Sequence, residues 1–235
     1  MVLTDYLLEA QQRMTHARNY LAWQSRLVTP ELGPRVVEVG CGIGTFTGEM
    51  LDREAVLALD IDPECIERVR RHYPNRPNLR TLVCDAGSGG LSAFRDFRAD
   101  SCVCLNVLEH IEDDRTALAG MASLLRPGGV VVLLVPAFQA LFGPIDQNLG
   151  HFRRYRASLL APLAAEAGLQ VKKMRYLNSA GFFAWWASSK ILKREFHSER
   201  QIECYDRYCI PWIERLENRF HPPFGQSLFA VLRKP

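Results

Sequence analysis

Short apolar runs alternate along the chain with stretches whose apolar residues recur at helical spacing. The runs predicted as strands are residues 35–39, 55–59, 79–84, 101–105, 130–135, 169–176 and 228–232. The stretches predicted as helices between them are residues 45–53, 63–73, 115–125 and 158–167. Strands that are apolar throughout are typical of a sheet that helices cover on both faces. The pattern therefore predicts an α/β domain around a parallel, doubly wound sheet.

Two segments fall outside this alternation. Residues 1–29 show helical spacing ahead of Pro30 and predict one or two helices. Residues 177–226 separate the last two strands, and we expect two or more helices there, broken near Pro211. So long an insertion in a compact sheet usually carries function or packs as a cap. We therefore divide the chain into an N-terminal helical lid (1–29), a core domain (30–176 and 227–235) and a helical cap (177–226).

The composition is that of an ordinary globular protein. Of 235 residues, 48% are apolar and 23% are charged, which allows one domain with a sizeable core. The net charge of +3 is too small to predict a nucleic-acid partner. The seven cysteines lack the spacing of a disulfide framework or a zinc site, so we expect free thiols, a reducing compartment and no metal. The first residues show no signal-peptide pattern and the apolar stretch 179–192 is too short to span a membrane, so we expect a cytoplasmic protein.

The segment VVEVGCGIGTFT, residues 36–47, places three glycines at alternate positions directly after a strand. Such a turn presents bare backbone N–H groups at the carboxyl edge of the sheet, where this class of fold binds nucleotides. A dinucleotide fingerprint needs a glycine at its sixth place, which is Thr45 here. The turn therefore favours a nucleoside ligand without a diphosphate over a nicotinamide dinucleotide.

Three carboxylates accompany this turn. Asp60 ends the second strand, at the position where a carboxylate accepts hydrogen bonds from ribose hydroxyls. Asp85 ends the third strand, where its oxygen can meet an adenine amino group, although a plain turn-forming role is the alternative. Glu38 lies in the first strand and is placed to orient a cationic ammonium. Together they describe a ligand with an adenosine and a charged amino-acid tail.

Five segments in order resemble the successive motifs of the class I S-adenosylmethionine-dependent methyltransferases: VVEVGCGIGTFT, LALDID, LVCDA, CLNVLEHIED and LRPGGVVVLLVP. The resemblance implies a Rossmann-like, seven-stranded sheet whose last strand is antiparallel, with S-adenosylmethionine as cofactor. The cofactor contacts that it implies are Asn19, Tyr20, Trp23, Glu38, Gly40, Cys41, Gly42, Asp60, Ile61, Asp85, Ala86, Asn106 and His110. Ordinary helix packing is the alternative for Trp23, and hydrogen bonding within its loop is the alternative for His110.

The methyl acceptor is expected beside the segment GPIDQNLGHFRRYRASLL, residues 143–160, because it follows the fifth strand. The predicted catalytic residues are His151, Tyr155, Arg154 and Asp146. A histidine can take a proton from a hydroxyl near neutral pH, and arginines can hold an acceptor carboxylate or phosphate. The alternative is that these arginines pair with Asp146 or Glu166 and anchor the loop. The GHFRRY string resembles a subgroup of bacterial small-molecule methyltransferases associated with lipid, saccharide or natural-product pathways.

The expected function is O-methylation of a small organic acceptor by in-line displacement. The alternatives are methylation of RNA or another macromolecule, a non-catalytic cofactor-binding scaffold, and a nicotinamide oxidoreductase. The fourth strand ends in NVLE, whereas enzymes that methylate the amino groups of bases have an Asn/Asp-Pro-Pro-aromatic loop there. This counts against a nucleic-acid methyltransferase of that kind. The aromatic residues of the cap fit core packing, a wall for an apolar acceptor, a peripheral membrane contact through Lys190, Lys193 and Arg194, or a homodimer interface.

Overall fold

The structure, a computed structural model, describes residues 3–194, 196 and 198–235, so the first two residues of the predicted lid lie outside it. Its strands form one sheet in the order β3-β2-β1-β4-β5-β7-β6. The strands are β1 (Arg35–Val39), β2 (Ala55–Asp60), β3 (Leu79–Val83), β4 (Ala99–Leu105), β5 (Leu125–Pro136), β6 (Gln170–Leu177) and β7 (Ser227–Arg233). Strand β7 runs antiparallel between β5 and β6, whereas β1 to β5 pair in parallel. This confirms the expected doubly wound sheet with an antiparallel last strand.

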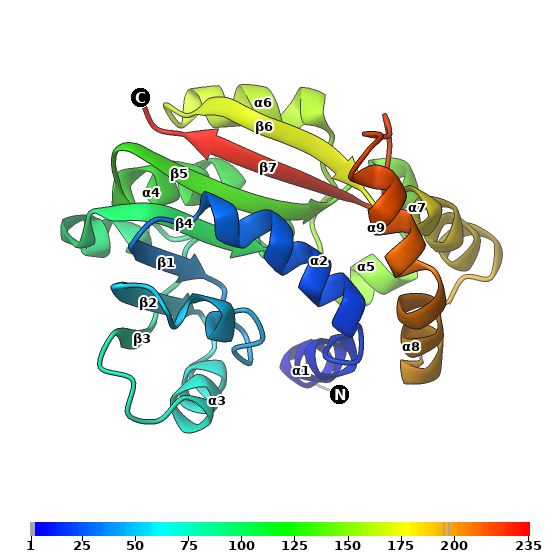
Figure 1. Cartoon of the computed structure of the whole chain (residues 1–235), viewed down its shortest axis with the longest axis horizontal. Helices are drawn as coiled ribbons and strands as arrows, with labels where there is room; N and C mark the ends of the chain where they lie inside the picture. The colour runs from blue at the N-terminus through cyan, green and yellow to red at the C-terminus, as the bar shows by residue number, and fades with distance from the viewer. Residues whose placement is uncertain (1–2, 195, 197) are drawn as a thin grey trace.

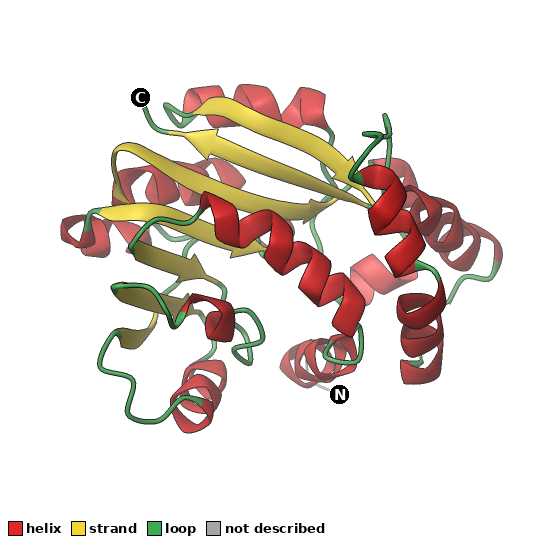
Figure 2. Cartoon of the chain, in the orientation of Figure 1, coloured by secondary structure: helices red, strands yellow, loops and turns green. Residues whose placement is uncertain are grey.

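The helices surround this sheet as Figure 2 shows. They are α1 (Leu3–Met14), α2 (Arg18–Val28), α3 (Pro63–His72), α4 (Asp114–Leu124), α5 (Pro144–Asn148), α6 (Ala157–Glu166), α7 (Ser179–Trp186), α8 (Glu199–Tyr208) and α9 (Ile210–Glu217). The local sequence sets their starts. Asp62 accepts from the Glu64 N–H at 2.8 Å ahead of α3, and Asp113 accepts from the Thr116 N–H at 3.0 Å ahead of α4.

Two separate cores lie on the two faces of the sheet. One face packs against α4 and α6 through Leu118 and Leu160, and the other packs against α2 and α9 through Trp23 and Ile210. Figure 1 shows α2 crossing one face of the sheet, with α4 and α6 on the other. Because the central strands supply alternate side chains to the cores on both faces, their runs are largely apolar, which is the pattern in the sequence.

One expected helix is wrong. Residues 45–53 do not form a helix after the glycine turn; only a single 3₁₀ turn, Thr47–Met50, forms there. The β-branched Thr45 and Thr47 and the glycine at 48 have low helix propensity. Thr47 also turns its hydroxyl to Glu38, with an Oγ1–Oε2 distance of 2.6 Å, so tertiary contacts fix this segment instead.

The cap residues gather beside the N-terminal helices, where Figure 1 shows α8 next to α1. Asp206 of α8 accepts from the backbone N–H groups of Asn19 and Tyr20 at 2.9 and 2.8 Å. His16 contacts Glu203 of α8 at 2.7 Å, and Pro211 lies in the first turn of α9, as expected from the break. No helix in the described ranges is long and apolar enough to cross a membrane. All seven cysteines carry free thiols.

Candidate active site

The glycine turn lies at the carboxyl end of β1, where the strand order reverses between β1 and β4. Gly40 and Gly42 have φ values of +77° and +51°, which residues with a side chain rarely adopt. A Cβ atom at Gly40 would lie 2.2 Å from Val107 Cγ2, so the turn also packs too tightly there for a side chain. The residue between them, Cys41, is 5% exposed. The turn therefore presents backbone rather than side chains to a ligand.

Asp60 lies at the neighbouring strand end and holds this turn. Its Oδ2 accepts from the Gly42 N–H at 2.7 Å and its Oδ1 accepts from the Asp62 N–H at 2.9 Å. Burial raises the pKa of Asp60 above its ordinary value, against the lowering effect of these backbone hydrogen bonds. The carboxylate is half-buried, so it is placed at the rim of the site and not inside the core.

Glu38 lies deeper, in β1 below the turn, and is 4% exposed. Its Oε2 accepts from the Thr47 hydroxyl at 2.6 Å. Burial raises the pKa of Glu38 to about 8, and the nearby negative charge of Asp60 adds to the effect. A cation beside Glu38 would reverse this balance, because an opposite charge favours the ionised form.

The predicted adenine contacts follow β2, β3 and β4 at the same edge of the sheet. Ile61 is 64% exposed, which is unusual for an isoleucine next to a buried strand. Asp85 is exposed, and its Oδ1 accepts from the Gly87 N–H at 2.8 Å, while Ala86 is buried. Asn106 is exposed at the end of β4 with φ +55°. Ile61, Asp85 and Asn106 are therefore exposed at one edge of the sheet, where a ligand can reach them.

Helix α1 covers the glycine turn. The Gln11 Oε1 accepts from the Ile43 N–H at 3.2 Å, and it lies 2.8 Å from the position that a Cβ atom at Gly42 would take. Bare turn backbone, two carboxylates at neighbouring strand ends and an exposed isoleucine fit a nucleoside with a cationic amino-acid tail, which is the chemistry of S-adenosylmethionine.

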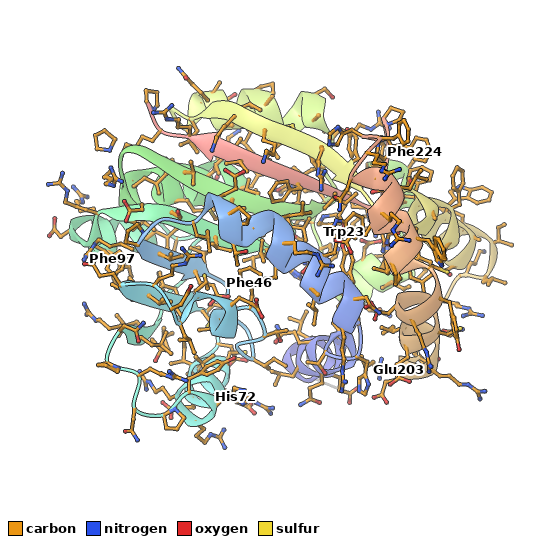
Figure 3. The ribbon with its side chains drawn as sticks, viewed as in Figure 1. Trp23, Phe46, His72, Phe97, Glu203 and Phe224 are labelled. Carbon is orange, nitrogen blue, oxygen red and sulfur yellow. The ribbon has the colours of Figure 1, made fainter. Side chains whose placement is uncertain are left out.

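The three candidates from α2 have mainly packing contacts. Trp23 is 1% exposed and lies between α2 and the sheet, as Figure 3 shows. Tyr20 contacts Trp23 edge to face at 6.2 Å, and its hydroxyl lies 3.2 Å from Ser227 Oγ. Asn19 is bound through its side chain to Asp206 at 3.0 Å. These contacts favour the packing alternative for Trp23 and make Asn19 a link between α2 and the cap.

Asp146 organises the segment that was predicted to carry catalysis. It has no exposed side-chain surface and accepts from the Arg154 Nε at 2.7 Å and from the Gly143 N–H at 3.0 Å. His151 Nδ1 lies 2.9 Å from its Oδ1. Burial acts to raise the pKa of Asp146, but His151 and Arg154 outweigh it and the pKa is lowered. An ionised Asp146 can only accept, so Nδ1 of His151 carries the proton and Nε2 is the free nitrogen.

Arg154 and Tyr155 turn their polar groups into the protein. Arg154 is 3% exposed, and its guanidinium lies over the Trp185 ring, 4.6 Å from the centroid. The Tyr155 hydroxyl donates to Asp114 Oδ2 at 2.9 Å, and burial raises its pKa well above the ordinary value. Both contacts anchor the loop to the rest of the protein. For Arg154 this favours the anchoring role, which was the alternative to holding the acceptor. The acid partner of Arg154 is Asp146.

Glu109, which was not among the predicted site residues, also lies beside His151. Glu109 in the LEHIED motif is 1% exposed and lies 4.0 Å from His151, measured from Oε1 to Nε2. Burial raises its pKa to about 8. His110 stacks edge to face on His151 with ring centroids 4.6 Å apart, and burial lowers its pKa to about 4. No signal in the sequence separates Glu109 from the three acids that follow it at positions 112 to 114.

Comparison with known proteins supports the same assignment. Residues 37–133 match the family model described as methyltransferase domain. An uncharacterized methyltransferase of Mycobacterium tuberculosis is 25% identical over 199 residues, covering 74% of this chain and 77% of the relative. A ubiquinone biosynthesis O-methyltransferase of Xanthomonas campestris pv. campestris is 31% identical over 131 residues, covering 53% of each protein. Among solved structures, geranyl diphosphate methyltransferase in complex with SAM has a TM-score of 0.60 at 15% identity, covering 90% of this chain and 84% of the other.

Proposed function

Because this chain is a class I S-adenosylmethionine-dependent methyltransferase, with S-adenosylmethionine as its cofactor, we propose that it methylates an oxygen atom of a small organic acceptor. The buried Asp146–His151 pair beside the end of β4 carries this proposal. Its Nε2 nitrogen can accept a proton, and it lies in the segment that follows β5. The name of the Xanthomonas relative, an O-methyltransferase, also favours oxygen as the acceptor atom.

The cofactor residues have separable tasks in this proposal. When bound, S-adenosylmethionine supplies a methyl group on a sulfonium, and the transfer is an in-line displacement. Asp60 would accept hydrogen bonds from the cofactor's ribose hydroxyls, and Glu38 would hold the ammonium of the cofactor's amino-acid tail. Ile61 and Asp85 would contact its adenine. Holding donor and acceptor in line is expected to supply about 7 to 11 kcal/mol of barrier reduction, which is more than a base alone contributes.

His151 is the residue that we assign to the acceptor hydroxyl. Its Nδ1–H donates to Asp146, which fixes the ring and its tautomer, so Nε2 accepts the hydroxyl proton. Arg154 neutralises Asp146 by donating from Nε to the same oxygen, Oδ1, at 2.7 Å. Arg154 then acts through Asp146 and His151 as a positioning residue, and Tyr155 anchors the loop through Asp114; neither touches the acceptor.

The cap supports an acceptor with apolar character. Phe183, Trp186 and Ile191 are 59%, 45% and 62% exposed, although an apolar side chain near a folded core is usually buried. Lys190 stands among them as a basic residue. We propose that this surface receives an apolar or lipid-like part of the acceptor, with a peripheral membrane contact or a homodimer as alternative uses.

The lid, core and cap division is part of the same proposal. Helix α1 touches the glycine turn through Gln11, so the lid would have to shift when a ligand enters. The cap is tied to the lid through Asp206 and Glu203, so acceptor and cofactor binding would be coupled through these contacts.

A methyl-label transfer screen over phenolic, lipid and saccharide acceptors tests the function. We expect label on an oxygen atom of one class, and a fall of roughly 10²- to 10⁴-fold in turnover for His151→Ala with unchanged affinity for S-adenosylhomocysteine. His221→Ala, an exposed histidine, is the matched control. Label on RNA, or cofactor binding without turnover on any acceptor, would replace this proposal with the macromolecule or scaffold alternative.

A further inference from the structure

Three side chains with metal-binding atoms converge beside the end of β4. Glu109 and His110 lie in the 3₁₀ turn Leu108–His110, and His151 comes from the loop after α5. One ligand atom of each lies within 4.8 Å of the others. Around a tetrahedral ion with bonds of about 2.0–2.2 Å, neighbouring ligand atoms are roughly 3.3 Å apart. Side-chain movements of about an ångström would therefore close this cluster on an ion.

The two histidines already have the supporting contacts of metal ligands. A metal-bound histidine usually donates its other ring nitrogen to a carboxylate or a backbone carbonyl, which fixes the ring. His151 donates from Nδ1 to Asp146 at 2.9 Å, and His110 makes a hydrogen bond with the backbone of Leu149. Each imidazole ring thus has one nitrogen in a hydrogen bond and a second nitrogen that can bind a metal ion.

Glu109 adds an independent observation. Its Oε2 is buried and has no hydrogen-bond partner among the described residues, although the side chain is only 1% exposed. A buried carboxylate oxygen without a donor is costly, and native proteins usually provide one or bind an ion there. A cation held between Glu109 and the two histidines would satisfy this oxygen.

The backbone holds the ligands in place without an ion. The Phe152 N–H donates to the Glu109 carbonyl at 2.8 Å, and the His151 N–H donates to the Asp146 carbonyl at 2.9 Å. These bonds join the loop to the turn after β4. The positive charge of Arg154 acts on Glu109, but Arg154 is paired with Asp146 at 2.7 Å, so it repels a cation less.

We propose that Glu109, His110 and His151 form a binding site for one divalent first-row transition-metal ion, with Zn²⁺ as the favoured occupant. Two imidazole nitrogens and one carboxylate oxygen are the protein ligands of one kind of catalytic zinc site, which leaves a further position for water or substrate. Nitrogen ligands disfavour Mg²⁺ and Ca²⁺, which prefer oxygen.

A role for the ion in methyl transfer rests on the proposed function, whereas its binding does not. The ion would take the His151 nitrogen that accepts the acceptor proton in the proposed function, so the two states of the protein would differ in where this proton goes. Without the ion His151 takes it, and with the ion an ion-bound acceptor hydroxyl would lose it to solvent. The O–CH₃ bond then forms as the S–CH₃ bond breaks, and the electron pair stays on sulfur. The ion does not change its oxidation state.

Zinc uptake by the full chain tests the site. The protein is stripped with a chelator, and Zn²⁺ is added in competition with an indicator of known affinity; Co²⁺ absorption reports the coordination. We expect one equivalent to bind, roughly 10- to 100-fold weaker binding for Asp146→Asn, and a larger loss for Glu109→Gln and His151→Asn. His72→Ala is the control, since His72 is exposed on α3, away from α5 in Figure 3.

Absence of uptake by the wild-type protein, or equal uptake by Glu109→Gln, His151→Asn and His72→Ala, would overturn the inference. S-adenosylhomocysteine affinity, measured on each variant, shows that it is folded and separates the two proposals. If the protein binds S-adenosylhomocysteine but takes up no zinc, the metal site is rejected and the proposed function stands. If it takes up zinc but neither binds the nucleoside nor transfers a methyl group, the proposed function is rejected and the metal site stands.

Discussion

The backbone N–H of Gly42 donates to the Asp60 carboxylate across 2.7 Å, so the glycine turn and the carboxyl end of β2 are fixed to one another. The turn therefore keeps its left-handed glycine conformations while the Asp60 carboxylate stays at the rim. The turn and the carboxylate that we propose to recognise the ribose are held by the same hydrogen bond.

Asp60→Ala is expected to weaken S-adenosylhomocysteine binding about 10- to 100-fold, because hydrogen bonds to a charged group contribute roughly 1.5–3 kcal/mol. Asp60→Asn keeps an acceptor for the Gly42 N–H and should lose less. Isothermal titration calorimetry measures both, with the exposed Asp96→Ala as control. Wild-type affinity in Asp60→Ala would remove this residue from the site.

Glu38 is expected to make the stability of the protein depend on pH. Its pKa is raised to about 8 in the fold from an ordinary value of 4.5, so the folded state holds a proton that the unfolded state has released. The contribution of Glu38 to the free energy of unfolding is complete below about pH 4.5 and is lost as the pH rises through about 8. Chemical denaturation at several pH values should show a shallower decline for Glu38→Gln than for wild type.

Glu109 has a similarly raised pKa, so part of the slope should remain in Glu38→Gln. The matched control is Glu54→Gln, whose side chain is 68% exposed. Identical slopes in wild type and Glu38→Gln would mean that Glu38 is ionised in the folded protein.

Asp146→Asn should destabilise the protein. It leaves the buried Arg154 guanidinium without its carboxylate, and breaking a buried ion pair costs about 3–5 kcal/mol. For a chain of this size that corresponds to a fall of roughly 6–20 °C in Tm. Asp52→Asn, at a side chain 73% exposed, should shift Tm little. A small shift for Asp146→Asn as well would show that Arg154 finds another partner.

Tyr155→Phe separates anchoring from catalysis. The hydroxyl donates to Asp114 at 2.9 Å from a buried position, so its loss should lower the free energy of unfolding by about 1–3 kcal/mol. Turnover per folded molecule should stay near that of Tyr208→Phe, a control at an exposed tyrosine. A large fall in kcat in folded Tyr155→Phe would give this residue a chemical role after all.

The apolar runs predicted every strand. In the central strands the reason is burial on both faces, which leaves a signal in each strand's own residues. The edge strands β3 and β6 keep exposed polar residues, such as Arg80 and Lys172.

The helix predicted at 45–53 failed, since Thr47 and Gly48 are shaped by Glu38 and Tyr73 and not by their neighbours in sequence. Glu109 was missed for a related reason: one acid among the four at positions 109 to 114 gains meaning only when a distant loop comes within 4.0 Å of it.

The sequence by itself determined the fold class, the glycine turn and the carboxylates at the strand ends, because hydrophobic period and backbone freedom are local properties. Only the tertiary structure decided which polar groups meet. It turned Arg154 and Tyr155 inward, buried Trp23, and brought Glu109 and His110 to His151. These contacts join residues far apart in the sequence, forty-two positions for Glu109 and His151, and their pairing depends on how the chain folds.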